Sequence, residues 1–131
     1  MSRGKFECKL DSMDVSSLRL HIDTELKQVD LASARGELSK AFEHLERDHV
    51  LGQSITYEHT RIHWRMFKLG LKMHSPREIF GQIVRIVGAA TKTPFGIYPS
   101  GNTGGANVWF FKRLPIPDDL REILEQAKMK S

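Results

Sequence analysis

The sequence predicts an all-α protein, a compact bundle of four to five helices with a long glycine-rich loop. Apolar residues recur at intervals of three and four along most of the chain, which is the spacing of one helix face. No two alternating segments are joined by a hairpin turn, so we expect no sheet. The 131 residues suffice for one hydrophobic core. We expect a single helical domain at residues 17–131 after a flexible lead-in at residues 1–16.

The first two predicted helices form a hairpin. One begins near Ser17 and the other covers residues 37–51, and Gly36 between them is the residue type that ends helices in a left-handed conformation. The apolar face of the first helix consists of Leu18, Ile22, Leu26, Val29 and Ala32. Together with Ala41-Phe42 and Leu45-Glu46, which follow the break at Gly36, these two helices resemble a single tetratricopeptide hairpin. That resemblance implies helix–turn–helix packing and a role in protein interactions, although one hairpin is not an array.

Three further helices follow. Apolar spacing predicts a helix at residues 56–73. The next helix begins at a capping box in which Ser75 is the N-cap, Pro76 takes the first helical position and Glu78 reaches back to the cap. Its apolar positions are Ile79, Phe80, Ile83, Val84 and Val87. A last helix at residues 120–128 follows two aspartates, which suit the positive end of a helix dipole.

A glycine- and proline-rich segment at residues 93–107 predicts a long loop, and loops of this length are often functional. Glycine and asparagine allow backbone conformations in which several amides converge on an anion. The candidate anion-binding residues are Asn102, Thr103, Gly104, Gly105 and Asn107. The segment lacks the Lys-Ser/Thr ending of a nucleotide-binding loop. The alternative is that the loop only packs over the helices.

Four residues on neighbouring helices have the types and spacing of a metal site. Glu46 and His49 lie three apart on one helix, and His59 and His63 lie four apart on the next. In an antiparallel pair these side chains lie at similar heights and on the inward faces. Buried imidazoles and carboxylates need partners. A divalent zinc, iron, nickel or copper ion would be a partner for all four side chains at once. The alternative is a hydrogen-bonded patch in which His49, His59 and Glu46 satisfy each other.

Charge is distributed unevenly along the chain. Residues 61–113 carry nine Lys and Arg side chains but one acidic residue, Glu78. This predicts an acidic protein partner at the basic face of residues 61–92, or simply a solvated helix face. No nucleic-acid reading motif is present, so nucleic acid is not expected as a partner. A homo-oligomer is left open. The single cysteine, the lack of a membrane-spanning apolar run and a charged N-terminus predict a cytoplasmic protein.

Several separated motifs are shared with a known family. HLER at residues 44–47, HVLGQ at 49–53, HTRIHW at 59–64 and GNTGGAN at 101–107 resemble a small family of bacterial proteins of about this size, catalogued as a domain of unknown function. The resemblance covers about residues 20–125 and implies a helical fold, but no activity. Asp48 departs from it, because a small apolar residue is expected at that position.

The function predicted from these observations is that of a metal-binding accessory protein that uses Glu46, His49, His59 and His63. The alternative is a tetratricopeptide-like interaction module in which the histidines form a structural patch. Whether the protein is an enzyme is left open, although the sequence pattern pairs no nucleophile with a base and so favours a non-enzymatic role.

Overall fold

The computed structural model describes residues 14–97, 100–108 and 112–129. Most of the described residues are helical and none of them forms a strand, which confirms the all-α prediction. The helices are α2 (Val15–Ala34), α3 (Leu38–Gly52), α4 (Thr56–Lys72), α5 (Pro76–Lys92) and α6 (Asp118–Met129), with a short 3₁₀ helix η1 (Thr93–Phe95) after α5. Helix α2 begins at Val15, and the rest of the expected lead-in, residues 1–13, lies outside the described residues.

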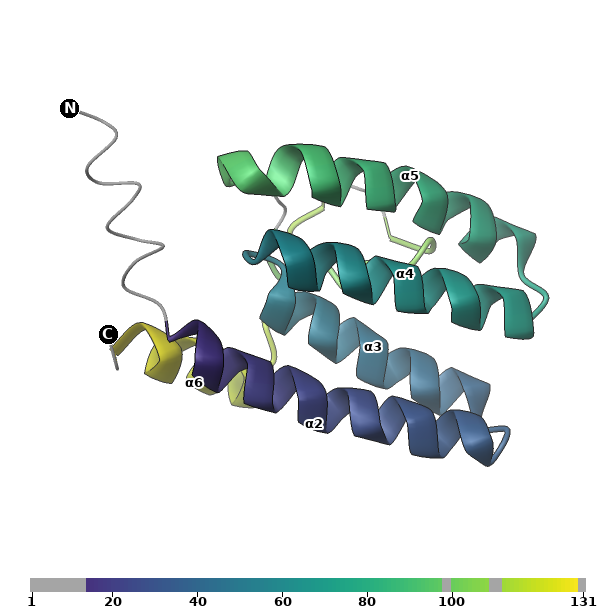
Figure 1. Cartoon of the computed structure of the whole chain (residues 1–131), viewed down its shortest axis with the longest axis horizontal. Coiled ribbons are helices and arrows are strands. Elements are labelled where there is room, and N and C mark those ends of the chain that lie inside the picture. The colour runs from purple at the N-terminus through teal and green to yellow at the C-terminus, as the bar shows by residue number, and fades with distance from the viewer. Residues whose placement is uncertain (1–13, 98–99, 109–111, 130–131) are drawn as a thin grey trace.

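Four of the helices lie side by side in chain order, each antiparallel to the next (Figure 1). The predicted hairpin is formed by α2 and α3, and its turn contains Gly36 at a φ of +75°. A second hairpin is formed by α4 and α5, and α3 packs against α4 between the two. Helix α6 covers the beginning of α2 and also contacts α3.

The core lies mainly between α2, α3 and α4. All five apolar positions predicted for α2 are buried. The core of the bundle also includes Leu45 of α3, Ile62 and Met66 of α4, and Leu120 of α6. The backbone N–H of Asp14 donates to the carbonyl of Ala127 over 2.7 Å and ties the start of α2 to the end of α6. This packing fixes the relative positions of α3 and α4, on which the candidate site depends.

Helix α5 is present as predicted, but most of its apolar side is turned outward. Phe80 is 75% exposed and Val87 is 60% exposed. The residues that α5 buries include Gln82 and Arg85, two polar residues that interrupt its apolar pattern. The capping box is half confirmed. The Ser75 hydroxyl accepts from the backbone N–H of Glu78 over 3.3 Å, whereas the Glu78 carboxylate accepts from the backbone N–H of Ala106 in the loop.

Candidate metal centre

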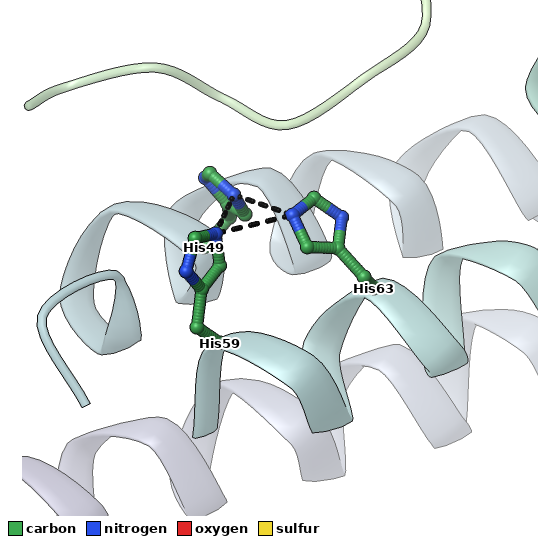
Figure 2. Close-up of side chains that lie close together, drawn as sticks. All are labelled: His49, His59 and His63. Carbon is green, nitrogen blue, oxygen red and sulfur yellow. Dashed lines mark hydrogen bonds between the residues drawn. The ribbon is translucent and has the colours of Figure 1, made fainter. Parts of the chain in front are cut away.

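Three imidazoles from two helices meet at one point in the interior. His49 lies in the last turn of α3, and His59 and His63 lie one turn apart at the start of α4. The connection between these helices is only residues 53–55, so the end of α3 lies beside the beginning of α4. The three Nε2 atoms are 3.0, 3.0 and 3.1 Å from one another, as the dashed lines in Figure 2 mark. The side chains are 2 to 6% exposed.

The other ring nitrogen of each histidine has its own partner in a different part of the chain. Nδ1 of His49 is 2.6 Å from the backbone carbonyl oxygen of Asn102 in the loop. Nδ1 of His63 is 2.6 Å from Oε1 of Gln82 on α5. Nδ1 of His59 is 2.7 Å from the hydroxyl of Thr93 in η1. Each ring is therefore held in orientation by a hydrogen bond on the side away from the cluster.

The partners of His49 and His63 fix which nitrogen carries the proton. A backbone carbonyl can only accept, so Nδ1 of His49 must donate to Asn102. The amide of Gln82 is oriented by its two Nε2 hydrogen bonds, to Oε1 of Glu78 over 2.6 Å and to the carbonyl of Gly104 over 2.8 Å. Its Oε1 therefore accepts from Nδ1 of His63. In the neutral rings, both Nε2 atoms carry only a lone pair.

Burial keeps the three rings neutral. It lowers the pKa of His63 to about 3, with a further decrease from the neighbouring His59, and it lowers the pKa of His59 to about 4. Burial and the two neighbouring imidazoles hold the pKa of His49 well below its usual range. The 3.0 Å contact between Nε2 of His49 and Nε2 of His63 therefore brings two lone pairs together with no proton between them.

Glu46, the fourth predicted ligand, is not in this group. The ligand atoms that lie within 4.8 Å of one another belong to His49, His59 and His63. The side chain of Glu46 is hydrogen-bonded to Thr103, and its partial burial raises the pKa of the carboxyl group. The structure thus brings together three of the four residues that the spacing selected.

The glycine-rich loop holds His49 in place. Besides the carbonyl that accepts from His49, Asn102 uses its side chain twice, since Nδ2 donates to the carbonyl of Lys112 and Oδ1 accepts from the backbone N–H of Gly104. Gly104 has a φ of +81°, and a Cβ atom there would lie 2.6 Å from Cδ2 of His49. The backbone amides of Gly104 and Ala106 already donate to side chains of the protein. The anion-binding role of Asn102, Thr103, Gly104, Gly105 and Asn107 stays a prediction.

A cavity of about 240 Å³ adjoins the three imidazoles, which form part of its wall. The facing wall is built by α5 and η1. It contributes apolar residues such as Val84 and Ala89 together with two cationic side chains, Arg85 and Lys92. Among the residues that the structure describes, none of those lining the cavity carries a carboxylate. Gln82, Arg85 and Thr93 are site residues that the sequence pattern did not predict, although the two polar residues inside the apolar pattern of α5 indicated that its inward face is polar.

Two buried acids lie next to the histidines in the sequence. Glu58 is 2% exposed and forms ion pairs with Arg19 and Arg61, at 3.3 and 2.8 Å. Asp48 is completely buried, and neither of its carboxyl oxygens has a hydrogen-bond partner. Burial, with a smaller contribution from the nearby Glu25, raises the pKa of Asp48 to about 9. This is the position at which the family resemblance implies a small apolar residue, and the structure encloses a protonated acid there.

Part of the basic face of residues 61–92 is paired within the chain. Arg61 forms an ion pair with Asp23 at 3.2 Å, and Arg65 forms one with Asp30, both on α2. The acidic partner stays a prediction, and these pairs reduce the positive charge that such a partner would meet. In the described part of the chain, every helix falls short of the length and apolar character needed to cross a lipid bilayer.

Comparison with known proteins finds one family model that matches most of the chain. It is described as a protein of unknown function, DUF3703, and it matches residues 16–124. No curated protein and no solved structure matches the chain. The matched range includes all three histidines of the cluster and the loop that contacts them.

Proposed function

The chain belongs to DUF3703, a family of unknown function, and we propose that this member binds a divalent transition metal through His49, His59 and His63. One observation carries the proposal. Three buried imidazole nitrogens converge to 3.0–3.1 Å, while the protons of at least two of the rings are committed to acceptors outside the cluster. A cation is the partner that the converging lone pairs of His49 and His63 lack.

The triangle of nitrogen atoms has dimensions suited to such an ion. The three nitrogen atoms lie 3.0–3.1 Å apart, close enough for all three to bind one ion, whose usual bonds to imidazole nitrogen are about 2.0–2.1 Å long. The hydrogen bonds between Nδ1 of these rings and Asn102, Gln82 and Thr93 are the kind of outer contacts that orient metal-binding histidines. Neutral imidazole ligands suit zinc, iron, nickel and copper.

A purely structural hydrogen-bonded patch accounts less well for the same contacts. Only His59 could present a proton at Nε2, if its Nδ1 accepted from the hydroxyl of Thr93. That proton could not lie between His49 and His63, which are 3.0 Å apart. Glu46, which this alternative requires, is bonded to Thr103 instead. The metal-binding accessory role therefore remains the function that the site supports best.

The proposal is tested by elemental analysis of untagged protein after supplementation with each of the four metals. We expect about one metal ion per chain, because three ligands define one site. The variant His63→Gln removes one ligand and should lose the metal, whereas His21→Gln changes an exposed histidine on α2 and should retain it. Circular dichroism establishes that both variants are folded. Sub-stoichiometric metal in the wild-type protein after supplementation would overturn the proposal.

A further inference from the structure

Exposed large apolar side chains are concentrated in one part of the molecule. Among the described residues, all of them except Leu20 and Leu31 of α2 lie between residues 57 and 97. Six of these side chains, each 47 to 75% exposed, lie on α4 and α5, and we call them the outer apolar face: Trp64, Leu71, Phe80, Ile83, Val84 and Val87. An exposed apolar patch on a protein surface marks a place of contact with a partner or a membrane.

The outer apolar face extends over two neighbouring helices. Its four residues on α5 recur at intervals of three and four, so they form a stripe on the side of the helix away from the buried Gln82. Trp64 and Leu71, seven residues apart, share one side of α4. A Cβ atom at Gly70 of α4 would lie 3.3 Å from Cβ of Glu78 at the start of α5. Because the two helices are antiparallel, this contact places Trp64 level with the middle of the α5 stripe. Figure 1 shows α5 at the edge of the bundle, where the stripe meets no other described helix.

Positive charge borders the outer apolar face. Lys68 of α4 and Arg77 of α5 each lie three or four residues from a member of the face, so their long side chains reach its edge. Both are exposed, and neither forms an ion pair with a described residue. The acids of these two helices are used elsewhere. Glu58 is buried, and the carboxylate of Glu78 accepts from the backbone N–H of Ala106 in the loop.

We propose that the outer apolar face binds the surface of an anionic lipid bilayer. Its side chains enter the boundary between headgroups and acyl chains, and Lys68 and Arg77 meet the lipid phosphates. Trp64 suits this depth, because the indole ring is apolar and carries one polar N–H group. The proposal uses none of the three histidines, so it does not depend on the metal site.

A second copy of the chain fits this face less well. In a symmetric dimer the same patch lies on both subunits, so Lys68 and Arg77 of one subunit would add their charge to that of the other. The residues of the face and its border contain no carboxylate to pair with them. An anionic bilayer supplies the opposite charge, and its fluid acyl chains accommodate side chains that project as far as Phe80, which is 75% exposed.

The test is cosedimentation of the full chain with vesicles of phosphatidylcholine and phosphatidylserine, and with vesicles of phosphatidylcholine alone. We expect binding to the mixed vesicles that weakens as the salt concentration rises. Phe80→Ser should weaken binding by about tenfold or more, because an inserted ring is lost. Its control is Leu20→Ser, since Leu20 is 71% exposed but lies on α2. Lys68→Gln should weaken binding about fivefold, and Lys27→Gln, which changes an exposed lysine of α2, should not.

Two further measurements locate the contact and test for self-association. Trp109→Phe leaves Trp64 as the single tryptophan, and its emission should shift to the blue when mixed vesicles are added. Sedimentation velocity without lipid shows whether a second copy occupies the face. If the protein stays in the supernatant with both kinds of vesicle, or if Phe80→Ser binds vesicles as tightly as Leu20→Ser, the inference is overturned. A dimer that ignores vesicles and dissociates in Phe80→Ser would likewise overturn it, in favour of self-association.

Discussion

Asp48 offers the sharpest test of the structure, because its buried carboxyl group makes folding stability depend on pH. The pKa of this group is about 9 in the folded protein and 3.8 as an ordinary aspartate. The folded state therefore binds a proton that the unfolded state has released above pH 4. The stabilisation from protonated Asp48 is complete below the unfolded pKa and is lost as the pH rises toward the folded pKa. The contribution of Asp48 to the free energy of unfolding therefore falls by about 1.4 kcal/mol per pH unit within this range.

At neutral pH the difference between the folded and unfolded pKa of Asp48 lowers the free energy of unfolding by up to about 4 kcal/mol, because pH 7 lies about three units above the unfolded pKa. Asp48→Asn keeps the size of the side chain and removes the titration. The amide still lacks partners at this position, so part of the cost remains, and we expect a gain of about 2 to 3 kcal/mol at neutral pH. The gain should grow with pH, and it should become small or reverse near pH 4.

The assay is urea unfolding of the metal-free protein at about pH 5, 7 and 8.5, followed by circular dichroism. Asp30→Asn is the control, because Asp30 is an exposed residue on α2 whose ion pair with Arg65 contributes little. The buried histidines stabilise both proteins equally as the pH rises through about 6.5, so the effect of Asp48 is the difference between the two proteins. The stability of Asp48→Asn relative to the wild-type protein should increase across this range. If the difference in stability between the two proteins is the same at all three pH values, Asp48 is not protonated in the folded state, and its burial without partners is refuted.

Three further predictions concern the metal site. Gly104→Ala should weaken metal binding by more than tenfold, since a Cβ atom there would lie 2.6 Å from the ring of His49. The backbone conformation at this position also costs alanine about 1 kcal/mol. Calorimetric titration measures the affinity, and Gly88→Ala is the control, because a Cβ atom at Gly88 meets nothing within 4 Å. Gln82→Leu should lower metal affinity by about 10- to 100-fold through loss of the contact to His63, and an unchanged affinity in a competition assay would contradict the assigned orientation. Metal affinity should change little between about pH 7 and pH 5. Because the pKa values of His59 and His63 are near 4 and 3, few of these rings are protonated at pH 5, and protons compete weakly with the metal. Histidines of ordinary pKa would lose metal affinity steeply over the same range.

The sequence predicted the parts of this protein that depend on local periodicity. The apolar positions of α2 are buried as their spacing indicated, and the spacing of His59 and His63, with the short connection to His49, brought three imidazoles together. Glu46 does not join them, because it lies three residues before His49 on α3. Its side chain is therefore rotated by about 60° around the helix from that of His49 and lies about one turn away from it. That rotation directs Glu46 toward Thr103 of the loop.

The parts that could not be predicted depend on contacts between distant segments. Periodicity alone assigns the apolar residues of α5 to one face, but it does not say whether that face or the opposite one meets the bundle. Gln82 and Arg85 determine which face of α5 is buried, through hydrogen bonds to partners in the loop and on α4 that are about 20 residues away in the chain. The ring partners Asn102 and Thr93 are likewise supplied by tertiary packing, which single-sequence patterns do not contain.

The outer hydrogen bonds of the three histidines have a consequence for ion selection. Because Asn102, Gln82 and Thr93 anchor the rings from the loop, from α5 and from η1, the ligand positions are preorganised, and the helices do not have to fold around the ion as a zinc finger does. Three ligands held rigidly in this way restrict the coordination angles that a bound ion can adopt. At the proposed metal site we therefore expect ions that accept three imidazole nitrogens in this arrangement, whereas an ion that demands a square plane would have to distort three separate segments of the chain to obtain it.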